Sequence, residues 1–214
     1  RVTIRWSAAD GEQIDPQQRL CRIEGPTRAL LTGERTALNF LQCLSGTASV
    51  TRAYAQALAG TGATLLDTRK TLPGLRLAQK YAVRCGGGEN HRLGLFDAIL
   101  IKENHIIAAG SIGQALARAK QAHPEVKIEI EVEDLEQLKQ AFEAGAEFVL
   151  LDNFTLEALG AAVEMAKGKA RLEASGGFDL ANIRQAGETG VDYISVGALT
   201  KNTRAVDLSL RFES

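Results

Sequence analysis

The sequence has few cysteines, no long apolar run and almost no net charge, and each of these absences excludes a class of protein. Its three cysteines, Cys21, Cys43 and Cys85, are widely spaced and form no CxxC pair. This argues against a disulfide framework or a structural zinc site. No apolar run approaches the roughly 20 residues that span a bilayer, and the start lacks the pattern of a secretion signal. We therefore expect a cytoplasmic protein.

Charge and motif content narrow the function further. A net charge of −1 argues against a general nucleic-acid or membrane surface, which would need a large basic excess. The sequence also lacks a Ser-His-Asp order, a Walker-type phosphate loop, a GxGxxG fingerprint and an HExxH helix. With 214 residues, 45% of them hydrophobic, the chain can bury the core of one large domain, alone or with a small companion.

Six short apolar runs each end on a polar or glycine residue that can take part in chemistry. The runs alternate with amphipathic helical patterns over residues 75–83, 112–122, 135–144, 156–166 and 180–188, which predicts parallel strands joined by right-handed crossovers. Because such strands all end at one rim, we expect their ends to meet there. These ends are Asp67-Thr68-Arg69-Lys70, Lys102-Glu103-Asn104-His105, Glu131, Asp152-Asn153, Ser175-Gly176-Gly177 and Gly197-Ala198.

We predict an α/β fold, an incomplete (β/α) barrel of parallel strands with a small N-terminal α+β domain that the C-terminal strand rejoins. Six repeats fall short of the eight in a complete barrel. Residues 2–6, 19–23 and 205–212 alternate apolar with polar side chains, as half-buried strands do. Two helices are expected between the first two of these strands and the barrel, one from Thr32 to Gly46 and one from Ser49 to Leu58. The predicted domains are 1–38 with 203–214, and 39–202.

The acidic ends can be interpreted in two ways. Glu129, Glu131 and Glu133 alternate with aliphatic residues, so their carboxylates share one face of a strand. At a sheet edge that face would be solvated, whereas inside a barrel each carboxylate needs a partner or a metal. Asp152 follows an apolar run directly, and it can be a helix cap. Asn153 or Thr155 can cap the next helix instead, which would leave Asp152 free.

Two glycine turns follow consecutive strands near the end of the chain. Glycine lets backbone N–H groups approach a phosphate closely. Either turn alone is weak evidence, because glycine also ends strands for steric reasons, but together they favour a phosphate site. The turns are Ser175-Gly176-Gly177 and Gly197-Ala198.

A set of cations lies in the first half of the chain, beside apolar or glycine-rich segments. Any one of them can be an ordinary surface cation, and His105 can be a structural histidine. Lys102 is a stronger candidate because it follows an apolar run, and arginine forks suit carboxylates or phosphates. The sequence therefore predicts a cationic pocket in a nearly neutral protein. The set is Arg35, Arg69, Lys70, His91, Arg92, Lys102 and His105.

Five stretches carry a resemblance to a known family: TGERTALNF from residue 32, DTRKTLPGLR from 67, GGGENHR from 86, IKENH from 101 and LDNF from 151. They closely resemble nicotinate-nucleotide pyrophosphorylase (carboxylating), also called quinolinate phosphoribosyltransferase, over nearly the whole chain. The resemblance implies a pentosyltransferase that joins quinolinate to phosphoribosyl pyrophosphate with Mg²⁺. Pyrophosphate and CO₂ would be released, giving nicotinate mononucleotide for NAD biosynthesis. It also implies that the chain begins well inside the family's N-terminal domain.

The resemblance also implies roles for individual residues. Arg69, His91 and Arg92 would hold the quinolinate carboxylates. Arg35 would reach in from a neighbouring subunit of a homodimer or larger homo-oligomer. The expected catalytic residues and the expected cradle of the 5′-phosphate complete the site. Lys70 and Lys102 would lie near the pyrophosphate and the reacting carboxylate, Glu131 and Asp152 would hold the ribose hydroxyls and Mg²⁺, and the cradle would comprise Ser175, Gly176, Gly177, Gly197 and Ala198.

Two other functions stay open at this point. One is a homologous phosphoribosyltransferase-like protein with another substrate, including the related group associated with molybdenum uptake. A substrate with one carboxylate would not need Arg35, Arg69 and Arg92 together. The other is a non-catalytic barrel that binds sugar phosphates, against which the presence of Lys102 and the two acids speaks.

Overall fold

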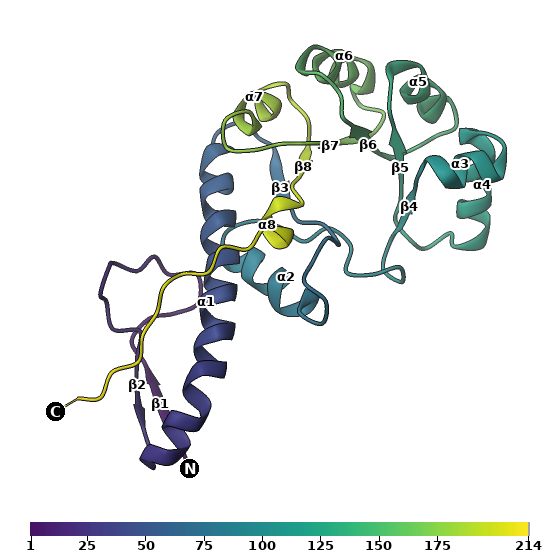
Figure 1. Cartoon of the computed structure of the whole chain (residues 1–214). Helices are drawn as coiled ribbons and strands as arrows, with labels where there is room; N and C mark the ends of the chain where they lie inside the picture. The colour runs from purple at the N-terminus through teal and green to yellow at the C-terminus, as the bar shows by residue number, and fades with distance from the viewer. Residues whose placement is uncertain (214) are drawn as a thin grey trace.

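A computed structural model describes residues 1–213, and its main element is a six-stranded parallel sheet with the order β3-β8-β7-β6-β5-β4. The sheet curls into an arc with helices on its outer side (Figure 1). Among the described residues, the edge strands β3 and β4 form no ladder with each other, so the barrel is open between them. The predicted incomplete α/β barrel is therefore confirmed. The strands are β3 (Thr64–Leu66), β4 (Ile99–Ile101), β5 (Ile128–Val132), β6 (Phe148–Asp152), β7 (Arg171–Ser175) and β8 (Tyr193–Ser195).

The core lies between the sheet and its outer helices. Alternate strand residues such as Ile130, Val149 and Ile194 are fully buried against these helices, which leaves the intervening residues on the inner face. Two of these helices begin at well-formed caps, where the side chains of Ser111 and Thr155 accept backbone N–H groups. The barrel helices are α2 (Arg76–Cys85), α3 (Glu103–Ala109), α4 (Ile112–Ala122), α5 (Leu135–Glu143), α6 (Leu156–Ala166), α7 (Ile183–Glu188) and α8 (Ala198–Lys201).

The N-terminal region contains one long helix where the sequence predicted two. Helix α1 runs without a break over Thr27–Ala57, so the predicted end at Gly46 is wrong. This glycine serves a close approach instead. A Cβ on Gly46 would lie 2.0 Å from the carbonyl oxygen of Arg204, so only glycine lets the C-terminal segment cross the helix there.

The small opening sheet pairs β1 (Thr3–Trp6) with β2 (Cys21–Glu24) in antiparallel fashion. The predicted strand over residues 205–212 is not formed. That segment runs along α1, where the Val206 N–H donates to the Gln42 carbonyl at 3.1 Å, and Glu213 then contacts Arg19 at 2.6 Å (Figure 1). The C-terminal segment does return to the opening domain, but its partner is Gln42 of helix α1, which accepts the Val206 N–H and donates to the Leu208 carbonyl, rather than a sheet edge. None of the described helices combines the length and apolar composition that a membrane span requires.

Candidate active site

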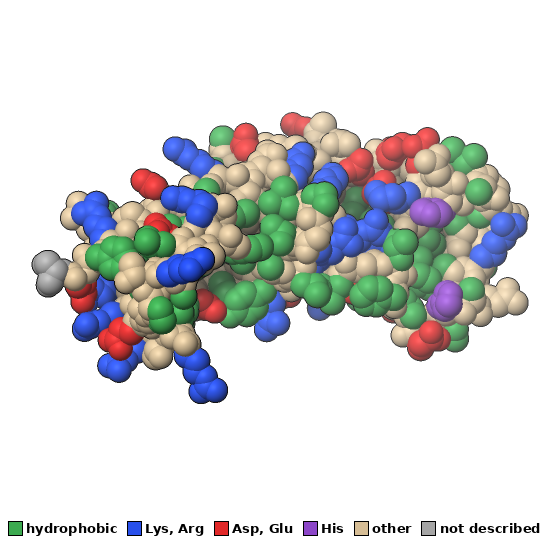
Figure 2. Space-filling model, turned by 60° about the horizontal axis from the view of Figure 1, so that its bottom comes forward, with side chains coloured by type: hydrophobic (Ala, Val, Ile, Leu, Met, Phe, Trp, Pro, Cys, Tyr) green, Lys and Arg blue, Asp and Glu red, His purple; other side chains and the backbone are tan. Residues whose placement is uncertain are grey.

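The ends of all six barrel strands lie at one rim, as the alternation predicted, because the sheet is parallel throughout. The register places Asp152 opposite Ser175, and Ser175 opposite Ser195. Figure 2 shows Lys and Arg side chains gathered in the middle of one face, with acidic side chains beside them. Residues that are far apart in the sequence thus share one mouth.

The cations of two separate segments come together at the open edge of the barrel. The N–H of Glu89 donates to the Leu65 carbonyl at 2.8 Å, and the N–H of Asp67 donates to the Glu89 carbonyl at 3.1 Å. The segment before His91 therefore runs beside β3 almost as a further strand. This places His91-Arg92 beside the segment that carries Arg69.

Arg69 and Arg92 form the centre of the cationic region. Nη1 of Arg69 is buried and has no hydrogen-bond partner among the described residues. Burial and the neighbouring Arg69 charge lower the pKa of Arg92. Two guanidinium groups close together with an unused buried donor are unfavourable unless an anion joins them. The arrangement is therefore suited to a carboxylate or phosphate ligand.

His91 lies beside the arginines, but its ring faces two carboxylates inside the barrel. Its Nε2 is 3.1 Å from Oε2 of Glu129 and 3.2 Å from Oε2 of Glu173. Burial opposes the charged ring, but the two carboxylates outweigh it and raise the pKa of His91 to about 9. The Arg92 N–H lies 2.7 Å from Nδ1, a contact that is a hydrogen bond only while Nδ1 is unprotonated. The contacts with the carboxylates determine the protonation state, and His91 is charged. A neutral His91 would leave two buried acids without their nearest opposite charge.

Glu129 and Glu173 are functional candidates that the sequence analysis did not assign. Both are buried, and neither Glu173 oxygen accepts a well-aligned hydrogen bond from the described residues. Burial raises the pKa of Glu173, whereas for Glu129 contact with His91 outweighs burial and lowers the pKa. The available signal was the alternation itself, because Glu173 stands between Leu172 and Ala174 as Glu129 stands between two isoleucines. The proposed contact of His91 with a substrate carboxylate stays a prediction.

The acidic side of the mouth is formed by the ends of β5 and β6. Glu131 makes a close ion pair with Lys102, which stands at the end of the adjacent strand β4. Asp152 accepts a hydrogen bond from Nδ2 of Asn153 at 2.8 Å. Lys102 also donates its backbone N–H to Nδ1 of His105 at 3.0 Å, so this histidine stabilises the start of α3. A cation and an acid from neighbouring strands thus meet at the rim.

Glycine is present in the two turns for different structural reasons. Gly176 has φ of 119°, and a Cβ there would lie 2.3 Å from Oδ1 of Asn153, so this position requires glycine. A Cβ on Gly197 would lie 3.1 Å from Cδ and 3.9 Å from Nζ of Lys70. The ammonium group of Lys70 therefore lies directly beside the second turn. A cation next to a glycine turn suits a phosphate group.

Arg35 is the one cation of the predicted substrate-binding set that this chain does not bring to the mouth. It is exposed on the N-terminal half of α1, the part of the helix that projects away from the barrel (Figure 1). Its contribution to a site would therefore have to be made in another copy of the chain, which stays a prediction.

Comparison with known proteins identifies the family. The family description "Quinolinate phosphoribosyl transferase, C-terminal domain" matches residues 47–211, and the corresponding N-terminal domain matches residues 1–45. The chain belongs to the quinolinate phosphoribosyl transferase family. The two matches meet near Gly46, inside α1. The predicted domain boundary after residue 38 falls in the same helix and stays a prediction.

Named relatives agree with this assignment. The nicotinate-nucleotide pyrophosphorylase [carboxylating] of Mycobacterium leprae is 47% identical over 97% of this chain and 74% of its own length. A probable enzyme of the same name from Bacillus subtilis is 44% identical over 94% of this chain and 70% of its own. The structure of the nicotinate-nucleotide pyrophosphorylase from Francisella tularensis superposes with a TM-score of 0.93 at 50% identity, covering 97% of this chain and 74% of that one.

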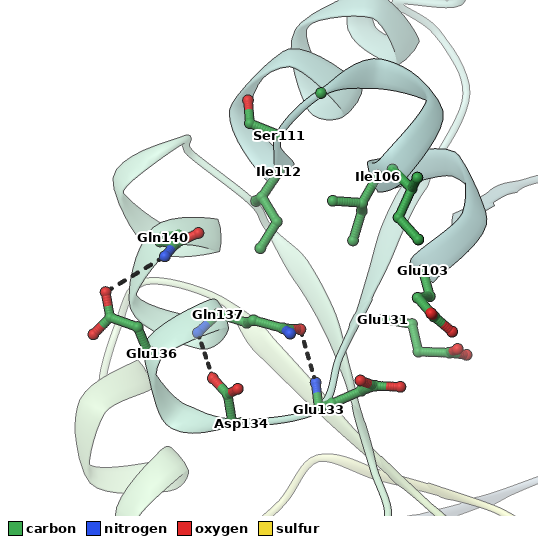
Figure 3. A pocket seen from close by; sticks show the side chains of 12 residues that line it. Glu103, Ile106, Ser111, Ile112, Glu131, Glu133, Asp134, Glu136, Gln137 and Gln140 are labelled. Atoms are coloured by element: carbon green, nitrogen blue, oxygen red, sulfur yellow. Dashed lines mark hydrogen bonds between the residues drawn. The ribbon is translucent and has the colours of Figure 1, made fainter.

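A hollow of about 480 Å³ between α3 and α5 is not the mouth of the barrel, although it lies close by (Figure 3). Of the candidate site residues only Glu131 lines it. Its other charged lining residues are acidic and would repel an anionic substrate. They are Glu103, Glu133, Asp134 and Glu136.

Proposed function

We propose that the chain transfers the phosphoribosyl group of phosphoribosyl pyrophosphate to quinolinate, giving nicotinate mononucleotide, pyrophosphate and CO₂ for NAD biosynthesis. Membership of the family and the names of the relatives support this activity. The observation that carries the assignment is the buried Nη1 of Arg69 beside Arg92, which has no hydrogen-bond partner among residues 1–213. A pyridine with two carboxylates supplies the anions that this pair of arginines lacks.

The chemistry needs positioning and electrostatic stabilisation, with no covalent enzyme intermediate. As the bond from the anomeric carbon to pyrophosphate breaks, positive charge develops on the ribose, and the pyridine nitrogen forms the new bond. Glu131 and Asp152 are the carboxylates that would stabilise this charge, while Lys70 and Lys102 would accept the leaving negative charge. The bond between the ring carbon next to the nitrogen and its carboxylate then breaks, and its electron pair stays on that ring carbon, where the adjacent positive nitrogen stabilises it. CO₂ leaves, and the ring carbon gains a proton.

Mg²⁺ is part of the proposal, and the donor set at the rim fits it. Magnesium binds one or two protein carboxylates and completes its shell with water and substrate oxygens. Glu131 and Asp152 supply two carboxylates from adjacent strand ends. When bound, the ion would neutralise charge on the pyrophosphate. Displacing Lys102 from Glu131 would free that carboxylate for it.

The 5′-phosphate is assigned to the two glycine turns. Ser175, Gly176 and Gly177 follow β7, and Gly197 and Ala198 follow β8 beside Lys70. We further propose a homodimer or larger homo-oligomer in which Arg35 of one copy reaches the mouth of another, because Arg35 is exposed far from the mouth of its own chain. The cytoplasmic location stays a prediction.

The decisive experiment supplies the purified protein with quinolinate, phosphoribosyl pyrophosphate and Mg²⁺ and follows nicotinate mononucleotide by chromatography. We expect product to form with one pyrophosphate and one CO₂ released per turnover. Nicotinate, which has one carboxylate, is the matched control and should react far more slowly. Equal use of nicotinate would contradict the role of the arginines. Calorimetric binding of both substrates without any product would instead indicate a non-catalytic sugar-phosphate barrel.

A further inference from the structure

Helix α2 directs three polar side chains, Arg76, Gln79 and Lys80, at the loops that form the mouth. Their spacing of three and four residues puts them on one face of the helix. We propose that these three are positioning residues that set the two substrate subsites separately: Arg76 and Lys80 set the quinolinate side, and Gln79 sets the sugar-phosphate side. The inference rests on the proposed function and deepens it.

Lys80 joins the end of β3 to the turn before Arg92. It is 1% exposed, and its Nζ donates to Oδ1 of Asp67 at 2.5 Å and to the His91 carbonyl at 2.8 Å. Asp67 in turn accepts the His91 N–H at 2.9 Å and Nδ2 of Asn90 at 2.8 Å. Two segments 24 residues apart are thus held by one buried ion pair. One carries Arg69, and the other carries Arg92.

Arg76 joins the same two segments one helical turn earlier. Its guanidinium donates to the Arg69 carbonyl at 3.3 Å, to the Leu93 carbonyl at 3.3 Å and to Oγ1 of Thr71 at 3.2 Å. The first two contacts are at Arg69 itself and at the residue after Arg92. Arg76 and Lys80 therefore fix the distance between the two arginines that are assigned to the substrate carboxylates.

Gln79 makes the corresponding link on the other side of the mouth. It is fully buried, its Oε1 accepts the Leu72 N–H at 2.8 Å, and its Nε2 donates to the Thr200 carbonyl at 2.8 Å. Oγ1 of Thr200 donates to the Lys70 carbonyl at 2.8 Å. Gln79 thereby ties the Lys70 segment to α8, which begins directly after the Gly197 turn. That turn is the one beside the Lys70 ammonium group.

Stability alone does not account for this arrangement. Burial raises the pKa of Asp67 and lowers the pKa of Lys80, so desolvation works against the charge on both partners. Well-packed apolar side chains often stabilise a protein as much as a buried ion pair does. The polar groups do fix geometry, because among the described residues each bridges two segments beyond the last backbone hydrogen bond that joins them. A merely structural role predicts equal damage to both subsites, whereas positioning predicts separate damage.

The test measures KM for each substrate in steady state for Arg76→Gln, Lys80→Met and Gln79→Met. The first two should raise KM for quinolinate at least tenfold and leave KM for phosphoribosyl pyrophosphate within about twofold, and Gln79→Met should do the reverse. Tenfold corresponds to about 1.4 kcal/mol of lost binding. Arg76→Lys should restore part of the quinolinate KM. The control is Arg84→Gln, an exposed position on the same helix, which should change neither constant.

Thermal unfolding of each variant separates positioning from loss of fold. Should Lys80→Met fail to fold, Arg76→Gln decides the quinolinate side, because Arg76 is only half-buried. Equal changes in both KM values, or unchanged KM values in folded variants, would overturn the inference. Absence of product from the wild-type protein would refute the proposed function instead, so the two failures are distinct.

Discussion

The charged state of His91 should make the stability of the protein fall as pH rises from about 6.5 to about 9. Contacts with Glu129 and Glu173 raise the pKa of His91 from 6.5 to about 9 in the folded chain. A raised pKa stabilises the fold fully below the unfolded value and no longer stabilises it above the folded value. The difference of about 2.5 pKa units corresponds to about 3 kcal/mol at most. The His91 side chain is only 11% exposed, so solvent screens little of this energy.

The assay is urea unfolding at a series of pH values between 6 and 9.5. The matched control is the double variant Glu129→Gln/Glu173→Gln, in which burial keeps His91 neutral and the decline above pH 6.5 should disappear. A wild-type free energy of unfolding that stays flat over this interval would refute the reasoning. It would mean that Nδ1 accepts the Arg92 N–H and that a carboxyl group holds the proton.

Four further predictions concern the site. Lys102→Ala should lower kcat at least about hundredfold, as loss of one electrostatic contact in a transition state does, with little loss of stability because the Lys102 side chain is 47% exposed; wild-type turnover would contradict its role. Arg92→Ala should raise KM for quinolinate roughly 10- to 100-fold, from the loss of about 1.5–3 kcal/mol in charged hydrogen bonds, with a smaller change in KM for phosphoribosyl pyrophosphate. Gly176→Ala should lower Tm, because strain and overlap with Asn153 would cost about 1–3 kcal/mol. The control is Gly160→Ala, a helical site with open space, which should raise Tm slightly. Chelation of divalent ions should abolish product formation and added Mg²⁺ should restore it; activity in excess chelator would exclude the metal.

The sequence was sufficient to predict the barrel and its mouth because both depend on local periodicity. Alternation placed Glu131 and Asp152 at strand ends, and the structure has them at one rim. The break at Gly46 was wrong because a contact with Arg204, 158 residues away, decides that position. The role of Lys80 was missed for the same reason. Its position in an amphipathic helix looks like an exposed face, and only the tertiary fold turns it onto Asp67.

The arginines lie at the mouth of the barrel and the buried acids lie inside it. This order explains how the folded protein accommodates a group of cations that is suited to a dianion. Arg69 and Arg92 repel each other at the mouth, and burial together with this repulsion lowers the pKa of Arg92. Glu129 lies close enough to attract Arg92, yet His91 takes up its nearest contact. The acids therefore reduce the cost of gathering the arginines without occupying their donors. Because Nη1 of Arg69 has no partner in the part of the chain that the structure describes, a substrate carboxylate meets a donor that it need not win from a protein acid.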